Sequence, residues 1–590
     1  MTSRRLLTFA LFFAALTNPT LAQEVSRIRG VDSRVDYAAL AEIGPWDDRN
    51  YQLTVEDLLV LADNERELKA PLPVFYRVLA RKAAPALPRS GPAQYPRSAV
   101  NFYLHQFGGY LVDGQLHRGV RWDAEAGRYQ VATEDGVPAE LWQPGAPEPE
   151  AVAVGEHRVS ATIDAAESAI AFHPTNSSLV IAGSNGPTAG QTMHASSDGG
   201  ATWTQVSLPL GGTCCDPTVE WNTAGTLAYA ATLGNCGFSG CSVWVYRTGN
   251  NGASWTDLED VTPGDPRREV TSAGQSDKEY LHVDRFPTSP HNDNVYLTWH
   301  DGNVLRFSRS TDDGHTWSAP VSLSSGSAQQ GIGSDIATDE NGNVYYFWPS
   351  FGAGATPSRI LVRKSTDGGA SFGSVVSVAD TLDDFDFAIP VMETRRVFIY
   401  VGADVDLTGG PFANRVYVTW TDNDGPEGST ANNHARVQVA FSSDGGATWN
   451  VRTPHETADL NTVDRFHPWI AVDAGGGVHV IFYDTRRDAG RNSVDLFHSV
   501  STDGGDTWST PDRLTSVQSP NISDGFEWGD YNGLSAVMQN VIAIYTDNRN
   551  ELGGGGNSVD VYAIGLTAAT PLFADGFESG DTSAWTVTVP

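Results

Sequence analysis

One polar loop, repeated six times, constrains the fold more than any other feature of this chain. Its copies are SSDGGATW (196–203), TGNNGASW (248–255), STDDGHTW (310–317), STDGGASF (365–372), SSDGGATW (442–449) and STDGGDTW (501–508). A carboxylate in such a loop accepts hydrogen bonds from backbone N–H groups of its own turn, glycine permits a positive φ, and the aromatic ring can be buried. The acidic position therefore has a structural role, and it is occupied by Asp198, Asn250, Asp312, Asp367, Asp444 and Asp503.

Each loop lies inside a longer unit with four strand-like segments. In the sixth unit these are PWIAVD, VHVIFYD and VDLFHSV, then the loop, and then TPDRLT. A final unit, FEWGDYNGLSAVMQNVIAIYTDNRN followed by SVDVYAIGL, has three segments and no loop. We expect HRVSATI (157–163) to supply its fourth strand and close a ring. The count is then seven units.

The pattern S-x-D-x-G-x-x-W is the Asp box, and residues 158–566 resemble the sialidase-type Asp-box (BNR repeat) β-propellers. Copies placed roughly fifty to eighty residues apart fit one blade plus insertions. The resemblance implies an all-β fold, a β-propeller with Asp-box repeats. Seven blades are favoured by the count of units, and six, as in the sialidases, are the alternative.

The rest of the chain divides by composition. Residues 1–22 have arginines, an apolar run and small residues, the pattern of a signal peptide. Residues 24–143 combine a helix-like stretch, LTVEDLLVLADNERELK, with aromatic strand-like pieces, which predicts a small α+β domain of unknown role. A Pro- and Glu-rich linker (144–157) follows. Residues 567–590 resemble the sorting tails of some exported bacterial proteins.

The charge of the chain limits its partners. A formal net charge of −33 repels nucleic-acid phosphates, so we expect no nucleic-acid partner. No stretch after the signal peptide is apolar and long enough to span a membrane. We expect a secreted or cell-surface monomer.

All four cysteines, Cys214, Cys215, Cys236 and Cys241, lie in one segment. An even number in an exported chain favours two disulfides over a metal site. Because adjacent cysteines bridge each other only with strain, we expect Cys214 and Cys215 to pair with Cys236 and Cys241, in either order.

Antiparallel blade topology locates a candidate site. The boxes lie at the face opposite the start of each first strand, so an axial pocket would form where first strands begin and second strands end. The residues expected there are Asp216, Asp277, Lys278, Glu279, Arg395, Arg396, Asp464, Arg465, His467, Glu527, Asp530 and Tyr531, together with Asp301, Asp422, Asp484, Arg486, Arg487, Asp547 and Arg549.

The resemblance to sialidases implies roles for some of these residues. Arginines hold the substrate carboxylate, and Arg396, Arg465, Arg486 and Arg549 match that role. Tyr531 would be the nucleophile, Glu527 its activating base, and Asp277 or Asp464 the acid. The F/Y-R-I-P signature of sialidases is absent; the nearest string is DRFPT (284–288).

Structural roles compete with these assignments. FYDTRRD and YTDNRN carry an aromatic residue, Asp and Arg at the same place in two units, which favours ion pairs within a blade for Asp484, Arg486, Asp547 and Arg549. His467 is more typical of a packed histidine than of an acid. DNDGPEG and DENGN resemble fragments of calcium loops without the full ligand series, so we expect no cofactor or metal and keep calcium as an open alternative.

Two functions are compatible with the sequence. The first is an exo-α-sialidase or related glycoside hydrolase that acts on glycans. The second is a non-catalytic propeller at the cell surface or outside the cell that binds glycan or protein.

Overall fold

The structure is a computed structural model of the 590-residue chain. It describes residues 59–62, 81, 110–112, 115–117, 120–123, 128–131, 153–161, 165–186, 190–209, 212–237, 240–255, 268–271, 276–353, 355–383, 385–423, 433–521, 528–538, 540–549 and 559–567. Predictions for the signal peptide, the C-terminal tail and most of residues 24–152 lie outside these ranges.

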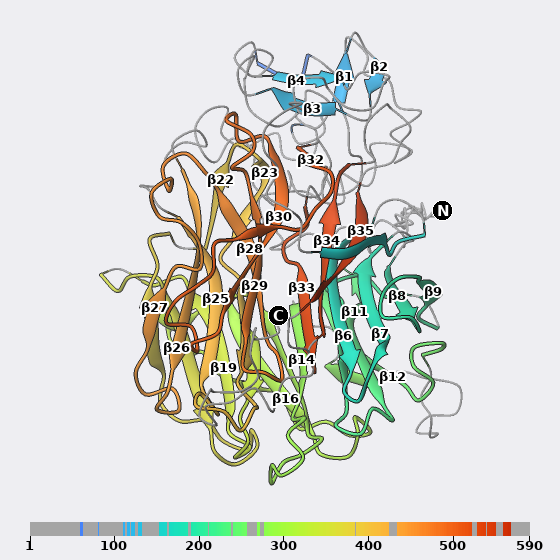
Figure 1. Cartoon of the computed structure of the whole chain (residues 1–590), viewed down its shortest axis with the longest axis vertical. Coiled ribbons are helices and arrows are strands. Elements are labelled where there is room, and N and C mark those ends of the chain that lie inside the picture. Colours follow the sequence, from blue (N-terminus) through green and yellow to red (C-terminus); the bar gives the residue numbers. More distant parts are fainter. Residues whose placement is uncertain are drawn as a thin grey trace, which may run out of the picture.

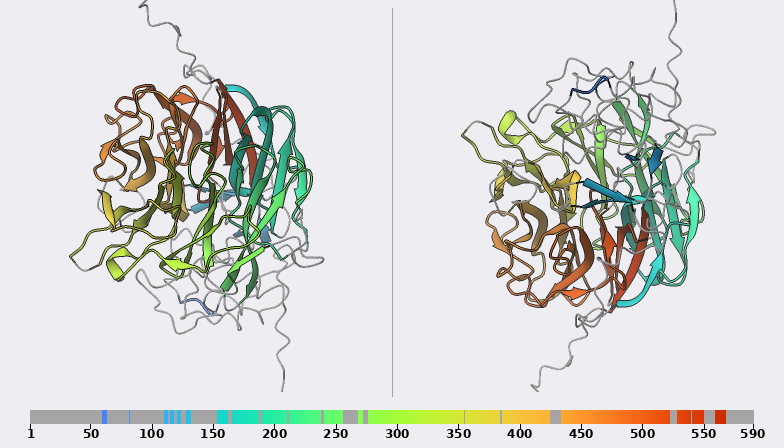
Figure 2. Two further views of the ribbon diagram at one scale, coloured as in Figure 1. Left: turned by 90° about the horizontal axis from the view of Figure 1, so that it is seen from below. Right: turned by 90° about the horizontal axis from the view of Figure 1, so that it is seen from above.

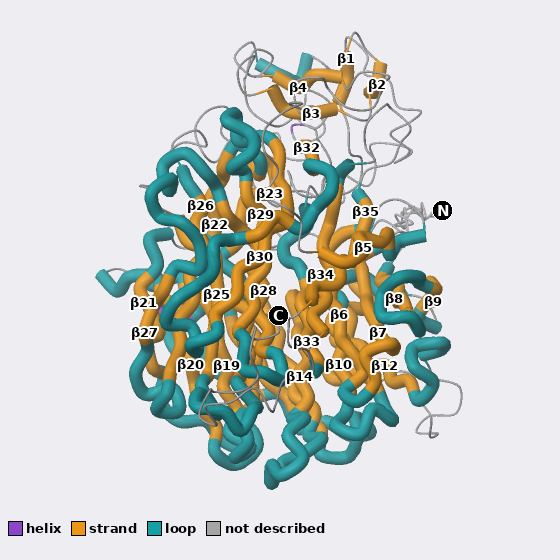
Figure 3. The backbone as a smooth tube through the Cα atoms, in the orientation of Figure 1, coloured by secondary structure: helices purple, strands orange, loops and turns teal. Residues whose placement is uncertain are grey.

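The described chain folds into seven antiparallel blades, which confirms the all-β propeller and the favoured blade number. The end-on views in Figure 2 show the blades following one another around a ring, and in Figure 3 the ring consists of strands and loops.

The strand bounds of the first four blades are as follows. Blade 1 comprises β6 (Ala166–His173), β7 (Asn176–Asn185), β8 (Gln191–Ser196) and β9 (Thr204–Ser207); blade 2 β10 (Thr218–Trp221), β11 (Ala228–Gly237), β12 (Gly240–Thr248) and β13 (Arg268–Thr271). Blade 3 comprises β14 (Ser276–Val283), β15 (Val295–Asp301), β16 (Val304–Ser310) and β17 (Val321–Ser322); blade 4 β18 (Asp335–Thr338), β19 (Val344–Ser350), β20 (Arg359–Ser365) and β21 (Val376–Asp380). A 3₁₀ turn, η1 (Ser327–Gln329), lies between blades 3 and 4.

The remaining blades complete the ring. Blade 5 comprises β24 (Val401–Val405), β25 (Val416–Asn423), β26 (Ala435–Ser442) and β27 (Asn450–Arg452); blade 6 β28 (Arg465–Val472), β29 (Val478–Asp484), β30 (Ser493–Ser501) and β31 (Asp512–Arg513), with β32 (Ser519–Pro520) also paired to β30; blade 7 β33 (Gly533–Val537), β34 (Asn540–Asp547), β35 (Asp560–Thr567) and β5 (Ala153–Arg158).

Strand β5 closes the ring by pairing with β35, so a segment from before blade 1 completes blade 7. It begins four residues before the segment predicted for this role, and residues 153–157, predicted as linker, belong to it. The backbone of Val159 and Ser160 continues the contact with Val561. The Gly- and Glu-rich composition of this segment does not predict a strand. Its pairing partner lies about 400 residues away along the chain, so no local pattern indicates the pairing.

Outside the blades, three hairpins are described. Two in the region predicted as an α+β domain pair β1 (Tyr110–Val112) with β2 (Gln115–His117) and β3 (Val120–Asp123) with β4 (Arg128–Val131). Residues 59–62, within the predicted helix, form a turn and bend. The third pairs β22 (Asp386–Ile389) with β23 (Met392–Phe398) between blades 4 and 5.

Each Asp box fastens its own turn. In the first, Asp198 accepts hydrogen bonds from Ser196 Oγ and Thr202 N at 2.8 Å, and Trp203 Nε1 donates to Gly200 O at 2.9 Å. Asn250 accepts the equivalent bond from Ser254 N at 3.0 Å. These contacts explain why the loop repeats without any catalytic requirement.

Several boxes also join neighbouring blades. A cation from one blade donates to a box carbonyl of the next: Arg247 to Asp313 O at 2.8 Å, Arg309 to Asp367 O at 3.2 Å, Lys364 to Gly445 O at 3.3 Å, and Arg415 to Gly504 O at 2.6 Å. Between the sheets the core contains fully buried tryptophans, which include Trp221, Trp255, Trp299, Trp348, Trp420 and Trp528. The boxes therefore link neighbouring blades at one face of the ring.

Candidate functional site

The backbone is left-handed where several first strands begin. Glu167, Asp216, Lys278 and His467 have φ between 50° and 58°, and they lie at or just before the first strands of blades 1, 2, 3 and 6. For a residue other than glycine, this conformation costs about 1–3 kcal/mol. Residues with such strained backbones are found most often at functional sites. We call this face of the ring, opposite the Asp boxes, the upper face.

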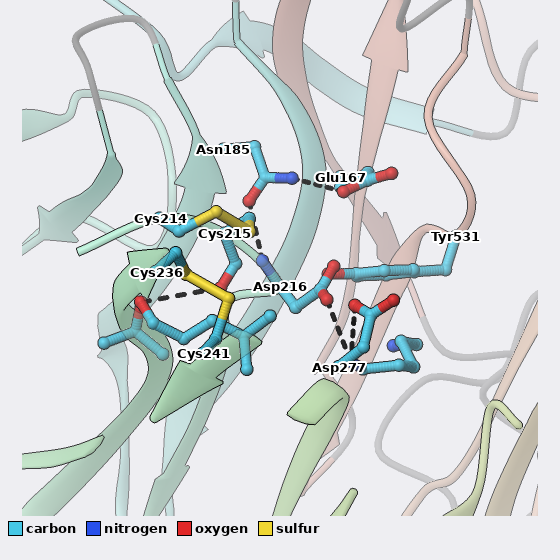
Figure 4. Close-up of a disulfide and its surroundings, with 12 residues drawn as sticks. Glu167, Asn185, Cys214, Cys215, Asp216, Cys236, Cys241, Asp277 and Tyr531 are labelled. Carbon is cyan, nitrogen blue, oxygen red and sulfur yellow. Dashed lines mark hydrogen bonds between the residues drawn. A yellow bond between two sulfur atoms is a disulfide. The ribbon is translucent and has the colours of Figure 1, made fainter. Parts of the chain in front are cut away.

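At the axis, Tyr531 before blade 7 meets Asp216 before blade 2 (Figure 4). Tyr531 Oη donates to Asp216 Oδ1 at 3.4 Å, and Lys278 N donates to Asp216 Oδ2 at 3.0 Å. The Lys278 ammonium lies 3.4 Å from the centroid of the Tyr531 ring. All three residues are 2 % exposed, so the hydroxyl, the carboxylate and the ammonium form one buried group.

Arg395 on β23 reaches across the axis to blades 7 and 1. Its Nε donates to Asp530 Oδ1 at 2.5 Å, and its Nη2 pairs with Glu167. Asn185 donates to the same Glu167 carboxylate and accepts from Asp216 N at 2.8 Å. Hydrogen bonds thus connect the arginine to the Tyr531–Asp216 pair, and they hold the β22–β23 hairpin over the upper face.

The three acidic residues predicted as catalytic differ in their surroundings. Asp277 borders the axial group: its Oδ1 accepts from Lys278 N at 2.9 Å, and its side chain is 17 % exposed. Asp464 is fully buried and bound by Arg491 Nε at 2.7 Å, which makes it a structural anchor between blades 5 and 6. Glu527 lies outside the described residues.

The four arginines predicted to bind a carboxylate have partners within or beside their blades. Arg465 is fully buried against Asp484 (2.7 Å) and Asp459 (2.7 Å), and Arg486 binds Asp484 (2.7 Å) and Glu456 (3.0 Å). Arg549 binds Asp547 at 2.7 Å and Glu156 on β5. Arg396 binds Asp386 O at 2.9 Å and is 30 % exposed. These contacts match the structural role that the repeated motifs indicated.

The disulfide pairing predicted from the sequence was wrong. Cys214 bonds to its neighbour Cys215, and Cys236 bonds to Cys241 (Figure 4). The loop is held by backbone bonds to β11 instead, since Cys214 N donates to Leu233 O at 2.7 Å and Leu233 N to Cys215 O at 3.2 Å. Strand pairing therefore supplies the long-range connection, and each disulfide closes only a local loop. The Cys214–Cys215 disulfide directly precedes Asp216.

Comparisons with known proteins agree with this architecture. The family described as "BNR repeat-like domain" matches residues 304–553. The chain is an Asp-box propeller with BNR repeats. A domain of unknown function (DUF8300) matches residues 36–121, ahead of the Asp-box propeller. A search of curated proteins found no match.

Several solved structures are similar to the Asp-box propeller at low identity and with TM-scores below 0.5. A lectin from Burkholderia pseudomallei is 11 % identical, with 69 % of this chain and 98 % of that one covered and a TM-score of 0.45. An α-L-arabinofuranosidase from Fusarium graminearum is 11 % identical over 70 % and 98 % (TM-score 0.39), and an α-L-arabinanase from Penicillium chrysogenum is 14 % identical over 59 % and 92 % (TM-score 0.37). At these values the likeness carries no argument about activity.

Sequence reasoning gave no role to several axial residues of the Asp-box propeller. Glu167 and Asn185 were not considered, although Glu167 in AAESAIAF stands at the start of a first strand, much as Asp216 stands just before TVEW. Alignment of the units would have found Glu167. Asn185 does not occupy a position that recurs in the other units. Arg395 lies on the hairpin inserted between blades 4 and 5, which the repeating unit does not predict.

Glu279, beside this group, has an unusual environment. It is fully buried, and neither carboxylate oxygen has a hydrogen-bond partner among the described residues. Burial, with Asp216 and Asp277 nearby, raises its pKa well above the usual value. These surroundings therefore favour the neutral form of Glu279, next to the Asp216 carboxylate.

Proposed function

We propose that this Asp-box propeller is a retaining glycoside hydrolase of sialidase type that acts on glycans. The contact between Tyr531 Oη and Asp216 Oδ1 carries the proposal, because a tyrosine nucleophile needs an adjacent base. Asp216 takes here the role that the sequence assigned to Glu527. Cations of Lys278 and Arg395 on either side suit a substrate that bears a carboxylate.

The proposed reaction has two steps. Tyr531 passes its proton to Asp216 and attacks the anomeric carbon, while Asp277 gives a proton to the departing glycosidic oxygen. Asp277 then takes a proton from water, which attacks the same carbon. The bond to Tyr531 breaks, and the tyrosine recovers its proton from Asp216.

Substrate access to this site requires movement, because Tyr531 is 2 % exposed. Arg395 is occupied by Glu167 and Asp530, so a substrate carboxylate has to replace one of them. Release of Arg395 would break the ion pairs that join the β22–β23 hairpin to blade 1 and to the segment before blade 7. We therefore propose opening of this hairpin as part of substrate binding.

The test uses purified full-length protein with a fluorogenic α-sialoside and a panel of aryl glycosides. We expect turnover on at least one of them, and a glycosyl adduct on the peptide that contains Tyr531 after rapid acid quench. Folded protein that turns over none of the substrates would exclude the hydrolase.

A second candidate is a non-catalytic propeller that binds glycans. The ion pairs of Arg465, Arg486 and Arg549 favour it, since these arginines are not gathered for a substrate carboxylate. Glycan-array binding that survives Tyr531→Phe together with Arg465→Ala, without hydrolysis, would support this candidate.

We also propose that the protein is exported. The pattern of residues 1–22 and the two disulfides support this, because disulfides persist in oxidising compartments. Among the described residues, no helix is long and apolar enough to cross a bilayer. Detection of a mature N-terminus near Gln23 in the secreted fraction tests this proposal.

A further inference from the structure

A second concave site lies on the axis, below the Tyr531–Asp216 group. Its volume is about 530 Å³, and its walls come from the first strands of the seven blades. The residues at its rim, such as Pro174, Gly409, Ala474 and Met538, follow the ends of first strands. Because first strands end at the Asp-box face, the cavity opens on the face opposite the proposed catalytic site.

An aromatic layer closes the inner end of this cavity. Tyr280 and Trp469 line it with ring centroids 5.2 Å apart. Lys278 lies over the Tyr280 ring at 4.8 Å, and Trp469 packs against Tyr531 at 6.4 Å. These rings separate the cavity from the upper site, so the two have different solvent access.

Carboxylates dominate the charge of the walls. Glu220, Asp335 and Asp404 line the cavity from blades 2, 4 and 5, and Arg285 is the one lysine or arginine in the described lining. Arg285 Nη1 lies 3.5 Å from Glu220 Oε2, an oxygen that is buried and without a hydrogen-bond partner. Asp473 of blade 6 also lines the cavity and is paired with His479 Nε2 at 3.0 Å, so a single guanidinium faces four acidic groups.

The two aspartates are partly held by the fold. Asp335 accepts from Ala403 N at 2.8 Å, and Asp404 accepts from Val472 N at 2.8 Å, each bond linking the first strands of adjacent blades. Backbone N–H groups satisfy lone pairs but do not supply a positive charge. Burial raises the pKa of Asp335 to about 7 and that of Asp404 to about 6, as expected for acids that lack a full counter-charge.

We propose that this cavity binds an organic ligand through primary ammonium groups. The ammonium supplies the positive charge that the carboxylates lack, and the rings of Tyr280 and Trp469 offer faces for a cation or an apolar surface. No group of three ligating side chains among the described residues is close enough for a metal ion, which favours a larger organic cation. Polyamines and amino sugars share this chemistry.

The proposal does not depend on hydrolysis at the upper face. Calorimetric titration of the full-length protein with spermidine, glucosamine and N-acetylglucosamine tests it. We expect binding of at least one amine and none of N-acetylglucosamine, which has the glucosamine ring without the charge. Spermidine alone would identify a polyamine site and glucosamine an amino-sugar site, whereas equal binding of both glucosamines or no binding of either amine would overturn the proposal.

Two variants locate the binding. Gly409 is exposed at the rim, and a side chain built there meets nothing within 4 Å, so Gly409→Trp is expected to fold and obstruct the mouth. Glu220→Gln removes one charge without changing shape. We expect amine affinity to fall at least about tenfold in the first and several-fold in the second.

Gly373→Trp is the matched control, because Gly373 is exposed in the loop after an Asp box and does not line the cavity. We expect this variant to bind amines as the unmodified protein does. Amine binding that persists in folded Gly409→Trp would place the ligand elsewhere and contradict the proposal.

Discussion

The Tyr531 hydroxyl lies 3.4 Å from the Asp216 carboxylate, although the two residues are 315 positions apart in the chain. Blade 7 ends the ring and blade 2 lies near its start, so closure of the ring brings them together. The proposed chemistry depends on this contact.

Removal of either partner is expected to abolish hydrolysis. Tyr531→Phe deletes the nucleophilic oxygen and Asp216→Asn the base, so we expect kcat to fall by a factor of about 10² to 10⁴. Tyr417→Phe is the control, because its buried hydroxyl has no hydrogen-bond partner among the described residues. Kinetics on the best aryl glycoside, with thermal unfolding of each variant, measure the effect; unchanged kcat in Tyr531→Phe would remove the tyrosine from the mechanism.

Arg395 is expected to stabilise the fold far more than its neighbour Arg396. Arg395→Ala leaves Glu167 and Asp530 buried without their cation, which lowers the free energy of unfolding by about 3 kcal/mol. Arg396 is 30 % exposed, so Arg396→Ala should cost less than about 1 kcal/mol. Urea unfolding compares the two, and equal losses would contradict the buried network.

Arg549 is expected to support ring closure rather than substrate binding. It joins Glu156 on the closing strand to Asp547 on β34, and these contacts lower the pKa of Glu156 to about 2 despite its burial. Arg549→Ala should destabilise the protein by about 2–4 kcal/mol and leave KM unchanged. A raised KM in a variant that unfolds at the normal temperature would instead indicate a substrate ligand.

Asp335 is expected to make stability fall as pH rises. Its pKa is about 7 in the folded state, where burial opposes ionisation and Lys278 and Asp404 are the nearby charges, against about 4 when unfolded. Between these values the folded state binds more protons, so this residue lowers the free energy of unfolding by about 1 kcal/mol per pH unit. Asp335→Asn should lack this slope; parallel curves from pH 4 to 7 would show that Asp335 is ionised in the folded state.

The Asp boxes are expected to contribute stability without activity. Asp444 accepts from Ala447 N at 3.0 Å and from Thr448 N at 2.9 Å. Asp444→Ala should cost about 1–2 kcal/mol. Asp444→Asn should cost less, because in the second box Asn250 accepts from Ser254 N the bond equivalent to that from Thr448 N. Chemical unfolding and the activity assay together test this prediction. A loss of kcat in Asp444→Ala would be inconsistent with a purely structural role.

The repeated segments were enough to predict the repeating unit and the face on which the boxes lie, and they favoured seven blades over six. Each of these follows from local chemistry: an acidic side chain bonds to its own turn, and strands alternate direction between turns. The structural reading of Arg486 and Arg549 also came from the repeats, because a contact within a blade recurs wherever its residues recur.

The axial group could be found only from the folded chain. Glu167, Asp216, Lys278, Arg395 and Tyr531 come from blades 1, 2, 3 and 7 and from the hairpin before blade 5, and no local pattern states how far one reaches toward another. The disulfide pairing was hidden for the same reason, since the register of β11 fixes the loop that the cysteines were expected to cross-link. Local hydrogen bonding specified the blades, while closure of the ring specified which side chains meet at its centre.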